Sequence, residues 1–424
     1  MRKHRPPKKK RAERKRRVLR IEAVTTVGAG AAGDVHVPFA LPGEVVEAEV
    51  EGRRGRVISR IETSPHRRAA VCPHFGLPGE GCGGCTLQHL GPDAALALKQ
   101  ERVLGAIRGV YADARIDAAY SSPPASRRRA KLSVTPGRAG LLALASRDIV
   151  PIPDCAVLRP DLVALAAPLG KLAARIGRRF DAQVTLTDTG IDVALLGLDH
   201  RELPLAAVEA MTRFTERHDI ARLTVEGATV TERRVPKVTL GGVPVTLPPG
   251  AFLQATSEGE RALAGEVEGA CGSSGRVADL FAGLGTFALA LARGSEVYAV
   301  DRAGPSIAAL KAAARDAGRP ITSEARDLAA RPLSASELAG FEAIVFDPPR
   351  AGAATQAAAI AEAGAERVVA VSCNPATLAR DLKRIAASYN LLRLAIIDQF
   401  GWSPHVEVVA VLERRRAHGS GRND

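Results

Sequence analysis

The sequence contains few aromatic residues, no long apolar segment and no recognisable signal peptide. Aromatic residues make up only 4% of the 424 residues, with a single Trp, so we expect cores built mainly from Ala, Val and Leu. No stretch approaches the roughly 18–20 consecutive apolar residues that a membrane-spanning helix needs. Arg20 and Glu22 stand where a signal peptide would have its apolar core. These absences predict a soluble, cytoplasmic protein with no membrane partner.

Cysteine is present, but the pattern does not suit a disulfide framework. The six cysteines are Cys72, Cys82, Cys85, Cys155, Cys271 and Cys373, and a chain without a secretory signal is not expected to pair them. Cys82 and Cys85 are separated by two glycines, a close pair of the kind that holds one metal ion or cluster. The spacing alone allows zinc as well as iron and sulfur. Cys271 has no partner in the sequence.

Positive charge is concentrated at the N-terminus. Residues 1–20 contain twelve Lys or Arg and one Glu, whereas residues 21–412 contain equal numbers of basic and acidic residues. We expect a disordered arm that attracts phosphate backbones without reading sequence; the alternative is a solubilising tail. The group from Arg127 to Arg129 with Lys131 is either a solvated surface or a second phosphate contact.

The first half of the chain predicts a small β-domain followed by a mixed α+β region. The length suggests two or three domains, since domains usually contain roughly 100–200 residues. Short apolar runs separated by Gly-containing turns predict a compact barrel similar to OB-like modules. Its expected strands are 21–27, 34–37, 44–50 and 56–61. After it we expect helices at 93–110 and near 159–175, and strands at 191–196 and 221–225.

From Arg276 onward, short β-rich runs alternate with Ala-rich helical segments. The runs are 277–281, 296–300, 343–346 and 367–371, and a last strand is expected at 406–412. This alternation predicts a parallel, doubly wound α/β sheet. In such a sheet, ligands bind at the carboxyl ends of the strands.

Two motifs follow strands of that sheet. Residues 279–287, Asp-Leu-Phe-Ala-Gly-Leu-Gly-Thr-Phe, form a Gly-rich turn that lets a ligand approach the backbone. The turn suits a dinucleotide or S-adenosylmethionine, and Asp301 would bind ribose hydroxyls in either case. Residues 346–352, Phe-Asp-Pro-Pro-Arg-Ala-Gly, place the Asp347 carboxylate in a rigid turn. This turn resembles the acidic loop that faces the target base in methyltransferases; a plain structural turn is the alternative.

Cys373, in Ser-Cys-Asn-Pro after the run 367–371, is a candidate nucleophile. Carbon 5 of a pyrimidine is a poor nucleophile, and addition of a thiolate to carbon 6 generates an enolate that can attack a methyl sulfonium. A base must then remove the hydrogen from carbon 5 so that the thiolate can leave. Glu407 is the best candidate for this base, and His405 is an alternative.

Together these motifs resemble those of the RNA uridine-5-methyltransferase family, and they occur in the family's order. The likeness covers residues from about 17 to 413, and within the family the chain looks most like the ribosomal RNA branch, which carries a TRAM domain and an iron–sulfur cluster. The matching segments are Phe252-Leu253-Gln254, 279–287, 347–352, 372–381 and His405-Val406-Glu407.

The resemblance implies a fold and a set of functional residues. It implies three domains: an N-terminal OB-like TRAM β-barrel (17–64), a mixed α+β central domain (65–247) and a Rossmann-like S-adenosylmethionine-dependent methyltransferase domain (248–413). A basic arm (1–16) precedes them, and a tail (414–424) follows. A helix at 92–110 is expected to pack on the catalytic domain. It implies Cys373 as nucleophile and Glu407 as proton acceptor. Cofactor contacts are implied for Gln254, Phe281, Thr286, Asp301, Asp327 and Asp347, and ligands of a 4Fe-4S cluster for Cys72, Cys82, Cys85 and Cys155.

This sequence departs from the family pattern at three points. Thr286 stands where many relatives have Asn, and Pro349 replaces a common Ala. Nine residues separate Cys72 from Cys82, against five in familiar members, and the extra residues 77–80 have a turn-like composition.

The expected activity is methylation of carbon 5 of a uridine in RNA by a monomeric enzyme. Large-subunit (23S) ribosomal RNA is the favoured substrate, transfer RNA the second candidate, and a non-catalytic RNA-binding or assembly factor the third reading. Amino-group methyltransferases share the Asp-Pro-Pro turn, but they stack an aromatic residue where this chain has Arg350, and their chemistry leaves Cys373 without a role. RNA cytosine-5-methyltransferases use a cysteine in a different motif.

Overall fold

The structure is a computed structural model that describes residues 14–76, 81–272 and 274–416. Most of the basic arm, the insertion at 77–80 and most of the tail lie outside these residues. The chain divides into two compact units. The first contains residues 1–95, 143–148 and 402–404, and the second contains 96–142, 149–401 and 405–424.

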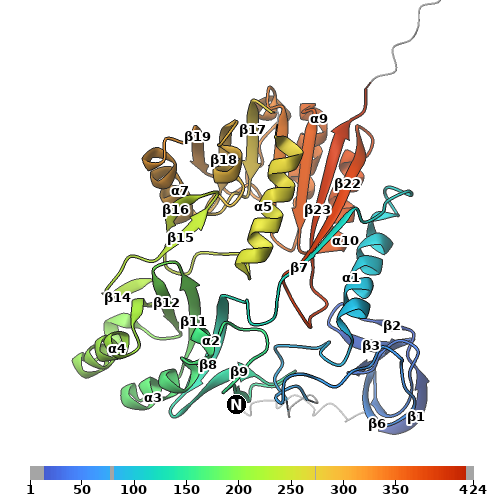
Figure 1. Cartoon of the computed structure of the whole chain (residues 1–424), viewed down its shortest axis with the longest axis vertical. Coiled ribbons are helices and arrows are strands. Elements are labelled where there is room, and N and C mark those ends of the chain that lie inside the picture. The colour runs from blue at the N-terminus through green and yellow to red at the C-terminus, as the bar shows by residue number, and fades with distance from the viewer. Residues whose placement is uncertain (1–13, 77–80, 273, 417–424) are drawn as a thin grey trace, which may run out of the picture. The chain divides into compact units, whose positions relative to one another are not determined.

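The first unit is built on one curled six-stranded sheet, drawn in blue in Figure 1. Its strand order is β1-β5-β6-β4-β3-β2, and a small core that includes Leu19, Val37 and Val46 lies inside it. The strands are β1 (Lys15–Arg20), β2 (Ala23–Val24), β3 (Ala29–Ala32), β4 (Val35–Pro38), β5 (Val45–Glu51) and β6 (Arg54–Glu62).

The strand predicted at 21–27 is much shorter than expected. Only Ala23 and Val24 are in β2, because the chain turns back at Thr25. The Gly28 amide donates to the Thr25 carbonyl (3.0 Å), and the Thr25 amide donates to the Ala29 carbonyl (2.7 Å). Gly28 has a φ of +84°, which glycine adopts without strain. The apolar run 21–27 therefore contains a turn.

The second unit contains a seven-stranded sheet in the order β10-β9-β8-β11-β12-β13-β14. All its pairs are antiparallel except β12 with β13. Its strands are β8 (Arg129–Thr135), β9 (Arg138–Leu142), β10 (Ile149–Pro151), β11 (Phe180–Thr187), β12 (Gly190–Leu196), β13 (Ile220–Val225) and β14 (Ala228–Glu232). Its helical segments are α2 (Pro160–Val163), α3 (Ala166–Ile176), η1 (His200–Glu202) and α4 (Leu205–Arg217).

The single helix predicted near 159–175 is two helices. α2 ends at Val163 and α3 begins at Ala166. Pro168 has no amide hydrogen to donate to the carbonyl of residue 164, and its ring crowds that carbonyl, so a continuous helix is disfavoured at this point. This loss of a hydrogen bond at residue 164 explains why α2 and α3 are separate helices.

The second unit also contains an eight-stranded sheet in the order β19-β18-β17-β20-β21-β23-β22-β7. All strands except β23 run in the same direction, since β23 pairs antiparallel with both β21 and β22. The strands are β7 (Ala118–Ser121), β17 (Arg276–Leu280), β18 (Glu296–Asp301), β19 (Ile321–Ala325), β20 (Ala343–Phe346), β21 (Arg367–Ser372), β22 (Tyr389–Asp398) and β23 (Glu407–Arg414). The predicted parallel α/β sheet is confirmed.

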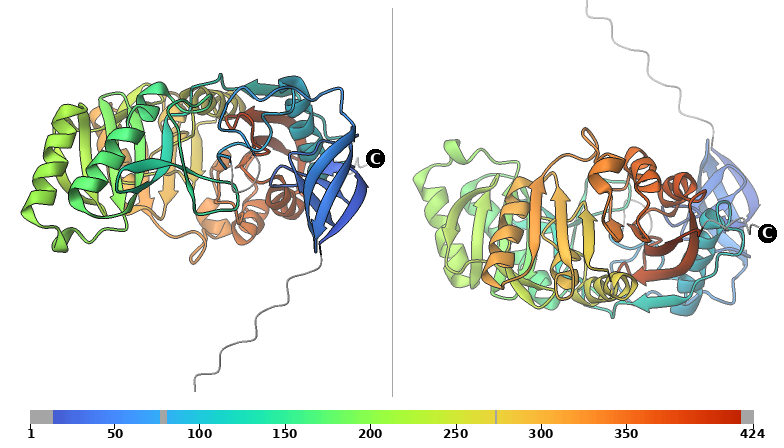
Figure 2. Two further views of the ribbon diagram at one scale, coloured as in Figure 1. Left: turned by 90° about the horizontal axis from the view of Figure 1, so that it is seen from below. Right: turned by 90° about the horizontal axis from the view of Figure 1, so that it is seen from above.

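Helices cover both faces of this sheet (Figure 2). Along β20, Ala343 and Val345 join one core with α5, α6 and α7, whereas Ile344 and Phe346 join a second core with α1, α8, α9 and α10. Burial on both faces explains why the strands are continuously apolar. The helices are α1 (Pro92–Ile107), α5 (Ser257–Cys271), α6 (Ala288–Leu291), α7 (Gly304–Asp316), α8 (Ala335–Leu338), α9 (Ala354–Ala363) and α10 (Pro375–Ile385).

The two sheets of the second unit are linked by a hairpin and a buried ion pair. The hairpin of β15 (Lys237–Leu240) and β16 (Val243–Thr246) turns through Gly241 and Gly242, both with positive φ, as its tight two-residue turn requires. Arg128, directly before β8, donates to Glu260 of α5 at 2.6 Å. No helix among the described residues is long and apolar enough to cross a membrane.

Candidate active site

Strand register brings three of the predicted residues to one edge of the eight-stranded sheet. Leu280 at the end of β17 pairs with Val300 of β18 and Phe346 of β20. The residues Phe281, Asp301 and Asp347 therefore lie at or just beyond the carboxyl ends of three adjacent strands. This edge is where open α/β sheets bind their ligands.

Cys373 and Glu407 lie opposite each other at the same edge. Ser372, the last residue of β21, pairs with Val408 of antiparallel β23. Cys373 directly follows Ser372, and Glu407 directly precedes Val408, so both residues lie at this edge, and the charge of Glu407 acts on the Cys373 thiol. Cys373 is partly buried, and Glu407 is only 7% exposed. The reversed direction of β23 thus brings the predicted base to the predicted nucleophile.

The electrostatics of this pair are those of an acid–base site. Burial raises the pKa of the Cys373 thiol, the Glu407 and Asp347 carboxyl groups raise it further, and Arg350 opposes them. Burial also raises the pKa of Glu407 to about 8, with Asp347 adding to the effect. Burial raises the pKa of Asp347 to about 7. The pKa values of the two carboxyl groups are thus shifted toward neutrality, which suits proton transfer. The raised pKa of Cys373 disfavours its thiolate, which Arg350 stabilises.

Gln254 and Glu407 are joined by a residue that the sequence did not single out. Gln399, just after β22, donates from Nε2 to Gln254 Oε1 (2.7 Å) and to Glu407 Oε1 (3.4 Å). All three side chains are buried. Gln254 therefore belongs to the same polar network as the predicted base.

Arg350 and His405 flank the pair. The Arg350 guanidinium donates to His405 Nδ1 at 2.9 Å, and the Arg350 carbonyl accepts from Asn374 Nδ2 (3.2 Å), next to Cys373. Arginine has only donors, so the contacted imidazole nitrogen is the unprotonated one. Burial, Arg350 and other nearby cations lower the pKa of His405. A neutral His405 that accepts from Arg350 orients this cation toward the thiol.

The Gly-rich turn lies beside this edge. Asp301 Oδ2 accepts from the Gly283 amide (3.1 Å), and Asp279 Oδ2 accepts from the Ala288 amide (2.9 Å). A Cβ on Gly285 would lie 2.4 Å from Leu310 Cδ1, so only glycine fits there. Phe281 has a φ of +65°, a strained conformation for a residue with a side chain.

Asp279 is a further residue of interest that the sequence analysis did not assign. It is fully buried, and among the described residues its Oδ1 has no hydrogen-bond partner. Burial raises its pKa well above the usual range. Its position inside the recognised motif was the available signal. An unpaired acceptor so close to the Gly-rich turn suits a ligand that carries hydrogen-bond donors.

The other two predicted cofactor residues are less enclosed. Thr286 is partly buried in the loop before α6. Asp327 is exposed after β19, and its Oδ1 accepts from the Ala329 (2.9 Å) and Ala330 (3.3 Å) amides. Asp327 Oδ1 therefore stabilises the turn after β19, whereas Oδ2 makes no hydrogen bond to these amides.

The predicted cluster ligands are distributed over both units. Cys72, Cys82 and Cys85 are in the first unit and Cys155 is in the second, all partly exposed. Backbone amides donate to two of the sulfurs, from Gly84 to Cys82 (3.4 Å) and from Leu158 to Cys155 (3.5 Å). In the part of the chain that the structure describes, no three His, Cys, Asp or Glu side chains are arranged to hold a metal ion.

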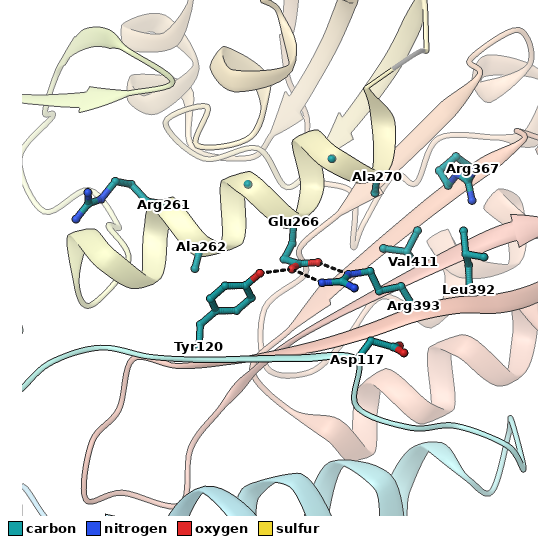
Figure 3. A pocket seen from close by; sticks show the side chains of 12 residues that line it. Asp117, Tyr120, Arg261, Ala262, Glu266, Ala270, Arg367, Leu392, Arg393 and Val411 are labelled. Atoms are coloured by element: carbon teal, nitrogen blue, oxygen red, sulfur yellow. Dashed lines mark hydrogen bonds and ion pairs between the residues drawn. The ribbon is translucent and has the colours of Figure 1, made fainter.

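A pocket of about 760 Å³ lies elsewhere in the second unit, and none of the predicted site residues lines it. Figure 3 shows Glu266 of α5 between Tyr120 of β7 and Arg393 of β22. The Tyr120 hydroxyl donates to Glu266 at 2.7 Å, and Arg393 donates two bonds of 2.8 and 2.9 Å. These contacts anchor the edge strand β7 and give the pocket a structural role.

Comparisons with known proteins identify the family. A family model described as tRNA (uracil-5-)-methyltransferase matches residues 327–415, which include Asp347, Cys373 and Glu407. An RNA methyltransferase of Brucella melitensis is 41% identical over 91% of this chain and 94% of its own length. The 23S rRNA (uracil(1939)-C(5))-methyltransferase RlmD of Pseudomonas fluorescens is 36% identical over 89% of this chain and 88% of its own length.

A solved structure has the same fold. The tRNA (uracil-54, C5)-methyltransferase of Pyrococcus abyssi, determined in complex with S-adenosyl-L-homocysteine, superposes with a TM-score of 0.73 at 23% identity, covering 94% of this chain and all of the other. The fold, the motifs at one sheet edge and the identity to full-length relatives lead to one conclusion. This chain belongs to the RNA uridine-5-methyltransferase family of enzymes.

Proposed function

We propose that this protein uses S-adenosylmethionine to methylate carbon 5 of a uridine in RNA through a transient covalent bond to Cys373. The observation that carries the proposal is that β21 and β23 pair up to Ser372 and Val408, which brings Cys373 and Glu407 to the same sheet edge, where the charge of Glu407 acts on the Cys373 thiol. When a uracil base lies against both side chains, the Cys373 thiolate can add to it and the Glu407 carboxylate can remove a proton from it.

The chemistry follows from these two side chains. The Cys373 thiolate adds to carbon 6 of the uracil, and the electrons of the carbon 5–carbon 6 double bond move toward the carbonyl at carbon 4. S-adenosylmethionine supplies the methyl group that carbon 5 then takes. The Glu407 carboxylate removes the hydrogen of carbon 5 as a proton, the double bond forms again, and the carbon–sulfur bond breaks to return the thiolate. Arg350 stabilises that thiolate, since it is the nearby cation that lowers the pKa of Cys373.

The residues at the sheet edge fit S-adenosylmethionine. A Cβ on Gly283 would meet no atom within 4 Å, so a ligand has room close to the backbone there. Asp301 can accept from ribose hydroxyls, and Asp279 has an unpaired acceptor. We therefore assign the cofactor to the Gly-rich turn at this sheet edge. Its proposed contacts are Gln254, Phe281, Thr286, Asp301, Asp327 and Asp347.

Ribosomal RNA is the favoured substrate class. The support is the 36% identity, over most of both chains, to an enzyme named for a uridine of 23S rRNA. Transfer RNA is the second candidate, because the matching family model carries a tRNA description. In either case we propose that the first-unit sheet is a TRAM-like RNA-binding barrel (17–64), followed by a central domain (65–247) and the catalytic domain (248–413).

We also propose that Cys72, Cys82, Cys85 and Cys155 hold a 4Fe-4S cluster in the mature protein. The support is the Cys-Gly-Gly-Cys spacing and the amide hydrogen bonds to two of the sulfurs, which are a common feature of cluster ligands. Among the described residues these side chains form no three-ligand group, and no catalytic step depends on the cluster. Anaerobic purification followed by absorption spectra and metal analysis tests it; zinc without iron would refute it.

Deletion of the gene, followed by mass mapping of 5-methyluridine in ribosomal and transfer RNA, tests the function. We expect one or more 5-methyluridines to disappear from 23S rRNA and to return when the wild-type gene, but not the Cys373→Ala variant, is restored. Loss confined to transfer RNA would reassign the substrate. Unchanged 5-methyluridine in both RNAs would contradict the proposed activity.

A further inference from the structure

Gln399 occupies an unusual position in the active-site network. Its side chain is 2% exposed and makes four hydrogen bonds. Oε1 accepts from the backbone amides of Ala255 (2.9 Å) and Thr256 (3.4 Å), and Nε2 donates to Gln254 (2.7 Å) and Glu407 (3.4 Å). Two backbone donors hold the oxygen end, so the amide cannot flip without losing both bonds. Its nitrogen end is therefore fixed toward the other two side chains.

The surrounding backbone is built to admit this side chain. Thr256 is the N-cap of α5, and its hydroxyl accepts from the Gly259 amide at 3.0 Å. A Cβ on Gly259 would lie 2.8 Å from the Cβ of Gln399. A larger residue on this turn of α5 would push Gln399 away. The start of α5 thus positions Gln399, and Gln399 in turn contacts residues of two other segments.

We propose that Gln399 is a positioning residue that holds the amide of Gln254 and the carboxyl group of Glu407 in one arrangement, and so links the cofactor side of the site to the base. The inference rests on the proposed function, in which Gln254 contacts S-adenosylmethionine and Glu407 removes the proton from carbon 5. Gln399 itself touches neither the cofactor nor the uridine in this account.

Several charged and polar groups around Glu407, including Gln399, set its pKa. Glu407 is faced by Asp347 after β20, Arg350 in the following turn, Cys373 after β21 and Gln399 after β22. Burial and Asp347 raise the pKa of Glu407, whereas the hydrogen bond from Gln399 and the charge of Arg350 lower it. Loss of the Gln399 amide removes one of the two groups that favour the ionised form of Glu407. Glu407 would then ionise at a higher pH.

The two halves of the reaction respond differently to this loss. Formation of the adduct uses the Cys373 thiolate and does not require Glu407 as a base. Its resolution requires the Glu407 carboxylate to take a proton from carbon 5 while the carbon–sulfur bond breaks. We therefore expect changes at Gln399 to slow proton removal far more than adduct formation.

The test uses Gln399→Met in the full-length protein with two RNA substrates. RNA with 5-fluorouridine at the target site, together with S-adenosylmethionine, measures adduct formation, because fluorine at carbon 5 cannot leave as a proton. RNA with tritium at carbon 5 of that uridine measures proton removal. We expect tritium release to fall by about tenfold or more at neutral pH, with its pH profile displaced to higher pH. Adduct formation should stay within about threefold of wild type.

An isosteric variant keeps the test valid if the methionine variant does not fold. Gln399→Glu keeps an oxygen for the Ala255 and Thr256 amides, but it places a second carboxyl group against Glu407. Two such groups cannot both ionise readily, so the pH profile of tritium release should move further toward high pH.

The matched control is Gln356→Met, because Gln356 is another buried glutamine. Its side chain is hydrogen-bonded to the Leu333 amide (2.9 Å) and carbonyl (3.1 Å). It should lose stability without any displacement of the profile.

The results separate this inference from the proposed function. If wild-type protein forms no adduct, the proposed function fails, and this inference fails with it. If wild type forms the adduct but the Gln399 variants keep the wild-type pH profile of tritium release, only the inference is refuted. Equal losses in both assays with an unmoved profile, as expected for a purely structural residue, would also refute it.

Discussion

Replacement of Glu407 by Gln is expected to make the protein more stable while it abolishes turnover. Glu407 is 7% exposed, and burial raises its pKa from 4.5 to about 8. Between these values the folded protein keeps a proton that the unfolded chain releases. The contribution of Glu407 to stability therefore falls as the pH rises through this range and levels off above about pH 8. Glutamine has the same shape and no proton to lose.

The size of the effect follows from the two pKa values. In the range between them, the free energy of unfolding of wild type should fall by about 1.4 kcal/mol per pH unit relative to the Gln variant. Between about pH 6 and pH 8 the advantage of the variant should therefore grow by about 2 kcal/mol. For a protein of this size, that growth corresponds to about 2–3 °C in melting temperature. Differences in packing or hydrogen bonding between Glu and Gln are present at both pH values and cancel in this comparison.

Thermal unfolding of both proteins at several pH values measures the effect. The matched control is Glu413→Gln, an exposed position on the same strand, β23, for which no such trend is expected. A melting-temperature difference between wild type and Glu407→Gln that stays constant or shrinks from pH 6 to pH 8 would refute the buried, protonated Glu407. In activity assays the same variant should form the methylated adduct and fail to release it.

Further expectations concern the nucleophile, its cation and the fold. Cys373→Ser should lose methyl transfer by at least about a thousandfold, because a hydroxyl adds poorly to carbon 6; measurable turnover near the wild-type rate would contradict the mechanism. Arg350→Met should displace the pH profile of adduct formation to higher pH, since Arg350 lowers the pKa of Cys373; a displacement to lower pH would show that the sign is wrong. Lys99→Met should destabilise the second unit by about 3–5 kcal/mol in denaturant titrations, because Lys99 is 1% exposed and pairs with Asp398 at 2.6 Å; an unchanged midpoint would show that the pair contributes nothing.

The sequence was most informative where function depends on motifs at strand ends. The Gly-rich turn, the Asp-Pro-Pro turn and the Cys373 motif each follow an apolar run, so a parallel sheet was expected to gather them at one edge, and it does. The pairing of Cys373 with Glu407 was inferred from chemistry. The structure adds the physical basis, which is the antiparallel register of β21 and β23.

Contacts that depend on distant parts of the chain were not predictable in this way. Gln399 was overlooked because a glutamine has no proton-transfer chemistry of its own and its bonded partner Gln254 is 145 positions away. The edge strand β7 pairs with β22 across an even larger separation, Ala118 with Ala395, and its short sequence contains no local signal for that partner. The break between α2 and α3, by contrast, had a local signal that we overlooked, because Pro168 disfavours a helix that continues through the preceding turn.

The central claim is that Cys373 becomes covalently bound to the target uridine while Glu407 resolves the bond. The most direct measurement is to incubate wild-type protein with S-adenosylmethionine and 5-fluorouridine-substituted target RNA, digest the product and locate the modified peptide by mass spectrometry. We expect one protein–RNA adduct in which a methylated fluorouracil nucleotide is attached to Cys373, and none with Cys373→Ser. Methyl transfer to natural RNA without any such adduct, or an adduct at a different residue, would contradict it.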